Sequence, residues 1–199
     1  MLLSIQRKAL LRISSGYRTM STMAAQVIAG IPPVTLLIEE RLHLYSRDDA
    51  KLRTTRLLER STTLEKWQRM WSDHSETAMW SKTMIPDVRQ WVSCKHRRLD
   101  FYLTQFLSGH GYFGDYTKRM GITEGSICGY CGAEDSPEHT IFVCQRWAAW
   151  RSNTESVIGA EVTSRSIIIL MMKSKENWNT IQRFVRNVMN AKRRDDILH

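Results

Sequence analysis

The chain has 199 residues, of which 42% are hydrophobic, and it carries a formal net charge of +9 at pH 7. This length allows a sizeable buried core in one or two domains. The longest apolar run, from Ile167 to Met172, is too short to span a bilayer, and Gln6-Arg7-Lys8 interrupts the first apolar residues, so we expect neither a membrane segment nor a signal peptide.

The charge is distributed unevenly along the chain. Residues 1–60 carry ten basic and five acidic side chains, and residues 145–199 carry the same numbers. Residues 128–144 carry three acidic side chains and no basic one. Basic flanks of this kind indicate a polyanionic partner, most simply a nucleic acid, although a basic surface without a partner is also common.

Two helices are predicted at the start of the chain. Apolar residues recur at helical spacing from Leu2 to Ile13, and Gly16 can end that helix. Ser21 is a suitable N-cap for a second helix from Thr22 to Ala29, which Gly30 would terminate.

A third helix is predicted from Thr35, and the sequence is strongly charged from Arg41 to Arg60. That stretch is either a solvated helix face or a basic surface for a phosphate backbone, and periodicity does not separate the two. The capping-box pattern Thr62-Thr63-Leu64-Glu65 predicts a new helix start. The helix after it has an apolar stripe that we assign to the core, formed by Leu64, Trp67, Met70 and Trp71.

The apolar pattern continues around Pro86 through Trp80, Ile85, Trp91 and Val92. An amphipathic helix from Leu99 to Leu107 is predicted to close at Gly109. A shorter helix from Tyr112 to Met120 is predicted to end at Gly121.

Three cysteines and one histidine follow with the spacing C-x2-C-x7-H-x4-C, namely Cys128, Cys131, His139 and Cys144. Three thiolates and an imidazole are a ligand set of tetrahedral zinc sites. Gly129 and Gly132 allow the backbone to turn around the first thiol pair. Ser136 followed by a proline predicts a helix start, and the five residues that separate His139 from Cys144 require a local distortion of that helix.

Four protein ligands leave no position for a catalytic water, so we predict a structural zinc ion. The motif is locally acidic, whereas a module that binds phosphate directly is expected to be basic. We therefore interpret it as a structural element that fixes the neighbouring segments in place. Tyr130 can stack on a base, although an aromatic residue beside a small metal site more often packs over it. The alternative is that the four residues are ordinary buried side chains.

Three further helices are predicted after the motif. The first continues past Trp147, and the second covers Ser164 to Met172, where a buried strand is the alternative. The last runs from Lys175 to Lys192 and has an apolar face formed by Trp178, Ile181, Phe184, Val185, Val188 and Met189. We interpret Lys192-Arg193-Arg194 as a solvated helix end, with contact to phosphate as the alternative.

Cys94 is the one cysteine outside the motif, so the pattern is not a disulfide framework. We therefore expect a reducing, intracellular compartment, nuclear or cytoplasmic. Cys94 and His96 would be replacement ligands if the register of the metal site were different. His110 lies in a turn-like Ser-Gly-His-Gly sequence, for which a structural hydrogen bond is the default. A zinc hydrolase would need an open metal position and a general base, and it is the weakest alternative.

Four blocks of the sequence, in this order, resemble one family. The run from Arg7 to Glu40, which contains LLRISSGYRTMSTMAAQVIAGIPPVTLLIEE, resembles the region after the polymerase core in reverse transcriptases of non-LTR retrotransposons. The insect jockey-like and ribosomal-DNA-inserting elements are the most similar groups. The other blocks are LTQFLSGHGYFGDYTKRMG from Leu103 to Gly121, the motif with PEHTIFVC, and KSKENWNTIQRFVRNVM from Lys173 to Met189. The resemblance covers nearly the whole chain.

The resemblance implies a mainly α fold in four parts. Residues 1–60 would be thumb-like helices, residues 61–124 a helical linker, residues 125–147 a CCHC zinc knuckle and residues 148–199 C-terminal helices. In full-length relatives these parts help to hold RNA and primed DNA while a separate palm performs reverse transcription. A palm and fingers region of the full-length element is therefore an expected partner.

Reverse transcription needs paired carboxylates that hold two divalent ions on a palm hairpin. This sequence has the doublets Asp48-Asp49 and Asp195-Asp196, but neither is flanked by apolar strands, and we interpret both as solvated charges. The fingers, palm and endonuclease regions of the family have no counterpart in the sequence. We expect the chain to be a truncated copy or a C-terminal fragment that is not an enzyme on its own.

The leading hypothesis is a non-catalytic reverse-transcriptase fragment that binds RNA or an RNA–DNA duplex without base specificity. The candidate contacts, chosen from charge clusters, are Arg7, Lys8, Arg12, Arg18, Arg53, Arg56, Lys95, Arg97 and Arg98. The alternative is a zinc-stabilised protein-interaction module or an inactive retrotransposon remnant. Because thumb helices pack against a palm, part of the apolar face of residues 1–60 is expected to be exposed.

Overall fold

Helices form nearly all the regular structure of residues 1–73 and 76–197, which the computed structural model describes. These ranges contain no β-strand, and a single antiparallel bridge joins Ile127 to Glu134. The helices are α1 (Leu2–Ile13), α2 (Thr22–Ala29), α3 (Val34–Tyr45), α4 (Arg53–Trp71), α5 (Met79–Met84), α6 (Val88–Ser93), α7 (Phe101–Ser108), α8 (Gly114–Arg119), α9 (Ala148–Ile158), α10 (Ile167–Lys173) and α11 (Lys175–Ile197). The predicted mainly α fold is confirmed.

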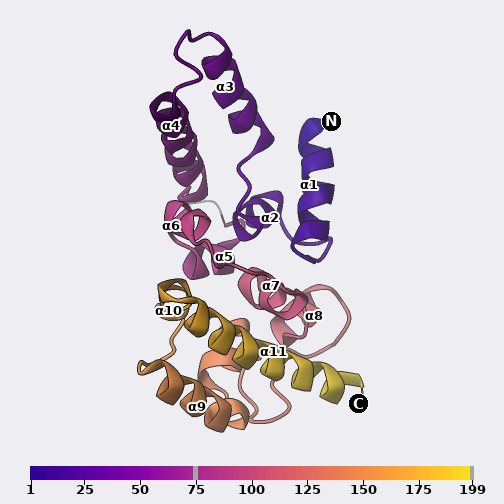
Figure 1. The fold of residues 1–199 in the computed structure, drawn as a ribbon. Helices are drawn as coiled ribbons and strands as arrows, with labels where there is room; N and C mark the ends of the chain where they lie inside the picture. Colours follow the sequence, from indigo (N-terminus) through magenta and orange to yellow (C-terminus); the bar gives the residue numbers. More distant parts are fainter. Residues whose placement is uncertain (74–75, 198–199) are drawn as a thin grey trace.

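Helices α3 and α4 lie side by side and project away from the other helices (Figure 1). We call these two helices and their connection the helical arm. Ion pairs link the two helices: Arg60 lies 3.0 Å from the buried carboxylate of Glu40, and Lys66 lies 2.8 Å from Glu39. Charged groups of α3 and α4 therefore bridge the two helices of the arm.

The start of α4 differs from the sequence prediction. The helix passes through residues 62–65 without a break, so the capping-box prediction was wrong. Inside the helix, the Thr62 hydroxyl donates to the carbonyl of Leu58 at 3.2 Å, which satisfies the hydroxyl without ending the helix. The helix begins instead after a turn in which Thr55 donates to the Asp49 carboxylate at 2.9 Å.

Other predicted helix ends are confirmed. The Ser21 side chain accepts a hydrogen bond from the Ala24 N–H at 3.1 Å and caps α2. Gly30 ends α2 with a φ of +70°, and Gly109 ends α7 with a φ of +68°. Glycine has no Cβ, so it adopts this left-handed conformation without steric cost.

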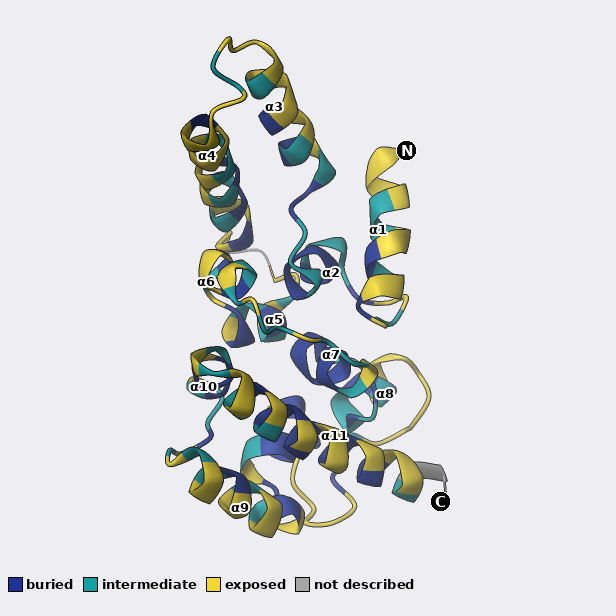
Figure 2. Cartoon of the chain, viewed as in Figure 1, coloured by how far each residue is buried: buried dark blue, intermediate teal, exposed yellow. Residues whose placement is uncertain are grey.

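Helix α7 occupies the centre of the core, where it contacts α2, α5 and α11 (Figure 1). Figure 2 shows that α7 is almost wholly buried, and its Leu103, Phe106 and Leu107 side chains are inaccessible to solvent. The predicted apolar face of α11 is also buried along its length, which confirms that prediction. Trp67 and Trp71 of α4 are buried as predicted, whereas Met70 is exposed.

The buried apolar residues form one continuous cluster that reaches from Leu10 in α1 to α11. The division at residues 60, 124 and 147 stays a prediction. The apolar stripe of α1 is only partly covered, because Leu2, Leu3, Ile5 and Ile13 are exposed. This confirms that part of the apolar surface of residues 1–60 lies open.

Within the part of the chain that the structure describes, no helix taken singly has both the length and the apolar composition to cross a bilayer. Helices α2 and α3 meet those criteria only as a pair, with a bend of 60° between them.

Candidate metal centre and basic groove

A tight turn next to the isolated bridge between Ile127 and Glu134 positions the first two predicted zinc ligands, Cys128 and Cys131. The Cys128 N–H donates to the carbonyl of Ala133 at 2.7 Å, and the Gly132 N–H donates back to the carbonyl of Cys128 at 2.9 Å. Gly132 has a φ of +75°, so it is the glycine that makes the turn possible.

A widened helical turn positions the other two predicted ligands. Ser136 caps this turn by accepting a hydrogen bond from the His139 N–H at 3.1 Å, as its sequence predicted. Residues His139–Val143 then form a π-helical turn, in which the Cys144 N–H donates to the carbonyl of His139 at 2.7 Å. This bond joins residues five apart, and it brings His139 and Cys144 to the same side. The predicted local distortion is confirmed.

The four ligand atoms lie within 4.8 Å of one another. The sulfurs of Cys128 and Cys144 are 3.9 Å apart, and the Cys131 sulfur is 3.2 Å from Nε2 of His139. In a tetrahedral site with bonds of about 2.3 Å, two sulfurs are separated by about 3.8 Å. The geometry of the donor atoms therefore fits a zinc ion held by three thiolates and one imidazole.

The electrostatics of the cluster also favour a cation. Burial, together with the neighbouring Cys128, raises the pKa of the Cys144 thiol to about 11. A hydrogen bond with the Ala133 backbone lowers the pKa of Cys131. A divalent ion stabilises thiolates that otherwise repel one another in a poorly solvated place.

Aromatic side chains cover one side of the cluster. The Tyr130 ring meets the Trp147 ring edge-on with 5.3 Å between their centroids, and Trp147 stacks on Trp150 at the same distance. Arg146 lies over Tyr130 and Trp147, and the Tyr130 hydroxyl donates to Asp195 in α11. Tyr130 thus packs against Trp147 and bonds to α11, and packing of its ring over the metal site stays a prediction.

A buried ion pair joins the metal-binding segment to α11. The Lys192 ammonium lies 2.6 Å from Oδ1 of Asp135, and both residues are buried. Asp135 also accepts from the Thr140 hydroxyl at 2.7 Å and from the Gly114 N–H at 2.8 Å. The interpretation of Lys192 as part of a solvated helix end was wrong, because α11 continues to Ile197 and this side chain turns inward.

The spare ligand-like residues lie outside the four-residue cluster. The Cys94 sulfur is 3.4 Å from Nε2 of His96, and the same nitrogen is 3.1 Å from the carbonyl of Met171. Nδ1 of His110 lies 2.7 Å from the carbonyl of Ser108, which agrees with the structural hydrogen bond predicted for this residue.

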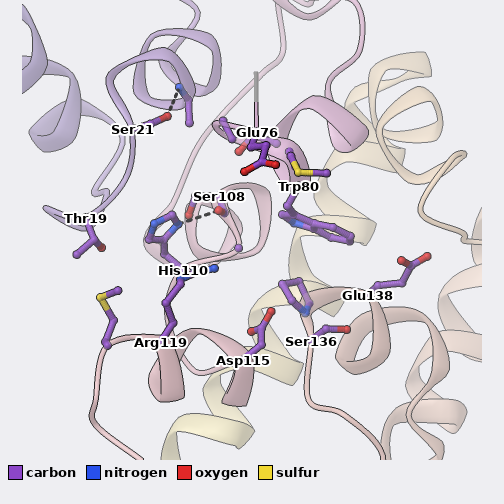
Figure 3. Close-up of a pocket in the computed structure, with 17 residues that line it drawn as sticks. Thr19, Ser21, Glu76, Trp80, Ser108, His110, Asp115, Arg119, Ser136 and Glu138 are labelled. Atoms are coloured by element: carbon purple, nitrogen blue, oxygen red, sulfur yellow. Dashed lines mark hydrogen bonds between the residues drawn. The ribbon is translucent and has the colours of Figure 1, made fainter. Parts of the chain in front are cut away.

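His110 lines a cavity of about 520 Å³ together with Trp80, Asp115 and Arg119 (Figure 3). Burial lowers the pKa of His110 and raises the pKa of Asp115. Among the described residues, Oδ1 of Asp115 is a buried oxygen without a hydrogen-bond partner. Sequence reasoning missed Asp115, because it carries no motif and its burial depends on distant segments.

Four of the nine predicted basic contacts meet in one groove at α1. This basic groove has a volume of about 560 Å³, and its lining includes Arg7, Lys8, Arg12 and Arg18. Arg7 forms its base, since its guanidinium donates to the carbonyl of Met20 at 2.9 Å. The side chains of Lys8, Arg12 and Arg18 are exposed.

The other five predicted contacts lie outside the groove. Arg53, Arg56, Lys95 and Arg98 are exposed. Arg97 is half-buried, and its guanidinium donates to the carbonyl of Trp91 at 2.9 Å and lies 5.2 Å from the centroid of the Trp91 ring. Burial lowers the pKa of Arg97, and its contacts are those of a packing residue.

Comparisons with known proteins find that this chain is similar to proteins of insect type-1 retrotransposable elements. It is 23% identical over 204 residues to the retrovirus-related Pol polyprotein of the type-1 element R1 4 of Nasonia vitripennis, covering 95% of this chain and 52% of the relative. It is 30% identical over 173 residues to the putative 115 kDa protein of element R1DM of Drosophila melanogaster, and this match covers 75% of this chain and 16% of the relative.

A third relative is the Pol polyprotein of element R1 of Popillia japonica, with 32% identity over 103 residues, covering 49% of this chain and 39% of the relative. The chain is homologous to a region of R1-type Pol polyproteins of insects, which confirms the predicted resemblance. The chain spans about half the length, or less, of these relatives. No protein-family model matches it, and no solved structure gives a significant match.

Proposed function

We propose that this chain is a nucleic-acid-holding region of an R1-type retrotransposon protein, which binds RNA or an RNA–DNA duplex through its basic helices without base specificity. The observation that carries the proposal is the basic groove, where Arg7, Lys8, Arg12 and Arg18 meet. The lining of the groove contains no acidic side chain. Cations concentrated in this way attract a phosphate backbone whatever its sequence.

In this proposal the zinc ion is structural. Four protein ligands close its coordination sphere, and the ion fixes the turn at Cys128 and the π-helical turn at His139 against each other. The Asp135–Lys192 pair then connects that unit to α11. Zinc thus supports the helical body, and the phosphate contacts lie elsewhere, on α1.

We further propose that residues 1–60 act as thumb-like helices beside a palm and fingers region of the longer protein, and that this chain supplies no catalytic carboxylates of its own. The absence of a catalytic role for Asp49 is supported by its geometry, because its carboxylate lies in a turn at the tip of the helical arm and accepts hydrogen bonds from Arg47 and Thr55. Thiolate ligands require a reducing environment, so we place the protein in the nucleus or cytoplasm.

Fluorescence anisotropy of the zinc-loaded chain with a labelled 20-nucleotide RNA, across a salt series, tests the proposal. Four phosphate contacts give a slope of about −3 in a plot of log affinity against log salt for a single strand. The double variant Lys8→Glu with Arg12→Glu should weaken binding by about tenfold or more and reduce that slope. A matched control is Arg165→Glu with Lys175→Glu, which changes the net charge equally on exposed residues far along the chain.

Equal affinities of the two double variants would exclude the basic groove as the binding surface. Absence of binding at low salt would overturn the proposal and favour the protein-interaction alternative. That alternative has one specific observation in its favour, the exposed apolar residues Leu2, Leu3, Ile5 and Ile13 on α1. Loss of association between this chain and the polymerase region after Leu3→Glu with Ile5→Glu would support it.

A further inference from the structure

The cavity of about 520 Å³ that His110 lines has a volume within the range of about 300–1,000 Å³ that holds small organic groups. We call it the Trp80 cavity. Its walls come from separate segments: the turn before α2, α5 with the residues before it, the turn after α7, helix α8, and the residues before the π-helical turn (Figure 3). Its lining shares no residue with the basic groove or the four predicted zinc ligands.

Trp80 gives the cavity a fixed aromatic wall. Its indole N–H donates to the carbonyl of Phe106 at 2.6 Å, and its ring meets the Phe106 ring edge-on with 5.9 Å between the centroids. A Cβ on Gly109 would lie only 3.2 Å from the indole, so this glycine lets the indole pack closely on the end of α7. The Trp80 side chain is half-buried, so it keeps an accessible surface in a position that does not depend on a ligand.

The lining of the Trp80 cavity carries more negative than positive charge. Three carboxylates line it, those of Glu76, Asp115 and Glu138, against one guanidinium, that of Arg119. Burial lowers the pKa of His110, so its imidazole adds no positive charge at neutral pH. The cavity is therefore an acidic hollow in a chain whose net charge is +9.

Asp115 has a hydrogen-bond acceptor that no described residue uses. Its Oδ1 is buried without a partner, although Arg119 lines the same cavity. The Arg119 guanidinium lies instead over the Tyr116 ring, 5.6 Å from its centroid. A carboxylate turns readily about its Cβ–Cγ bond, so a small rotation presents this oxygen to the cavity. A donor on a ligand would then remove the cost of the unpaired acceptor.

These groups select the charge and the shape of an occupant. A phosphate would be repelled by Glu76 and Glu138, which line the cavity from exposed positions. A metal ion is disfavoured because, among the described residues, only the four predicted zinc ligands bring three or more ligand atoms close enough to share one. A guanidinium group carries the complementary charge, stacks on an indole through its flat face, and directs several N–H donors to carboxylates on different sides.

We propose that the Trp80 cavity binds a guanidinium group, which stacks against Trp80, donates to Asp115 and has Glu138 as a second carboxylate partner. The group belongs either to a free small molecule or to an arginine side chain of a protein that docks here, and its chemistry is the same in both cases. This inference is independent of the proposed function, because no phosphate contact takes part in it.

Isothermal titration calorimetry of the full zinc-loaded chain tests the proposal. The probe is N-acetyl-arginine amide, and N-acetyl-citrulline amide is its neutral analogue of nearly the same shape. We expect the arginine probe to bind about tenfold or more tightly than the citrulline probe. Asp115→Asn should weaken binding of the arginine probe about tenfold, and Glu138→Gln, at an exposed position, about threefold. Asp48→Asn is the matched control, because it removes one exposed carboxylate on the helical arm and should leave binding unchanged.

Equal binding of the arginine and citrulline probes, or binding of neither, overturns the proposal, and this comparison needs only the wild-type chain. Variants at Asp115 and Glu138 that match Asp48→Asn overturn it as well, since the probe would then bind elsewhere. A short peptide with one central arginine distinguishes the two sources. Binding of this peptide about tenfold more tightly than the free probe supports a protein partner, whereas equal or weaker binding supports a small-molecule ligand.

Discussion

Removing one partner of the Asp135–Lys192 ion pair should be among the most destabilising single changes in this protein. The two side chains are 10% and 5% exposed, so neither charge is solvated once its partner is gone. Lys192→Met leaves the Asp135 carboxylate with two neutral donors, the Thr140 hydroxyl and the Gly114 N–H. Asp135→Asn leaves the ammonium without a charged partner, since only the neutral amide oxygen of the asparagine, the Thr140 hydroxyl at 3.3 Å and the Phe113 ring at 5.5 Å remain.

Breaking a buried pair by removing one partner typically costs about 3–5 kcal/mol. Each single variant leaves one buried charge with neutral partners alone, so we expect Lys192→Met and Asp135→Asn each to lose about 3 kcal/mol of unfolding free energy. The double variant should lose clearly less than the sum of the two, because it leaves no unpaired charge in the interior.

Urea unfolding of the zinc-loaded chain, followed by tryptophan fluorescence, measures these free energies. Arg47→Met is the matched control, because it breaks an ion pair whose side chains are 43% and 41% exposed, and it should leave the urea midpoint nearly unchanged. Losses below about 1 kcal/mol for both single variants would refute the reasoning, since they would mean that water reaches the pair.

Three other predictions concern the metal, the backbone and pH. Cys128→Ser should abolish zinc binding in metal analysis and lower the free energy of unfolding by several kcal/mol, whereas Cys94→Ser should keep one zinc per chain. Zinc retained in Cys128→Ser would contradict the assigned ligands. Gly159→Ala should lower the free energy of unfolding by about 1–2 kcal/mol, because alanine is strained in the left-handed conformation. Gly30→Ala should lower it more, because it also puts a Cβ 2.0 Å from the Arg97 guanidinium. Equal urea midpoints for the two variants would contradict that clash. Burial lowers the pKa of His110 from its usual value of 6.5, so the unfolded chain binds a proton at this residue more readily than the folded chain. The wild-type chain should therefore lose stability relative to His110→Asn as the pH falls below 6.5. Urea unfolding of both chains at several pH values measures the stability difference, and a difference that does not change with pH would refute the reasoning.

Features that depend on neighbours in the sequence could be predicted, and features that join distant segments could not. The Ser21 cap, the Gly30 stop and the four candidate metal ligands follow from spacing over a few residues; the structure has the cap and the stop in place and brings the four ligand atoms together. The apolar face of α11 follows from helical periodicity. Local rules sufficed here because each of these features is decided within one or two turns of chain.

The Asp135–Lys192 pair joins residues 57 positions apart, and nothing in either local sequence indicates a buried partner. The charge cluster around Arg97 predicts an exposed cation, but the packing of α2 and α6 gives its guanidinium carbonyl partners at Ala29 and Trp91. The capping-box pattern failed for a related reason, because Thr62 bonds equally well to a carbonyl inside a continuing helix. Tertiary packing decided the first two cases, and a competing local hydrogen bond decided the third.

The helical arm differs from the rest of the molecule in what holds it together. Its helices are linked by the Glu40–Arg60 and Glu39–Lys66 ion pairs, while Leu42, Leu57 and Leu58 face solvent. The arm is anchored in the core at its base, through Leu36 of α3 and the buried tryptophans of α4. The tip should therefore open as a separate cooperative unit at a lower free energy than α7 or α11, and amide hydrogen exchange would record this as early exchange that is confined to the arm and accelerated by salt. A partner that docks on those leucines could therefore change the orientation of the arm without a large loss of free energy in the core.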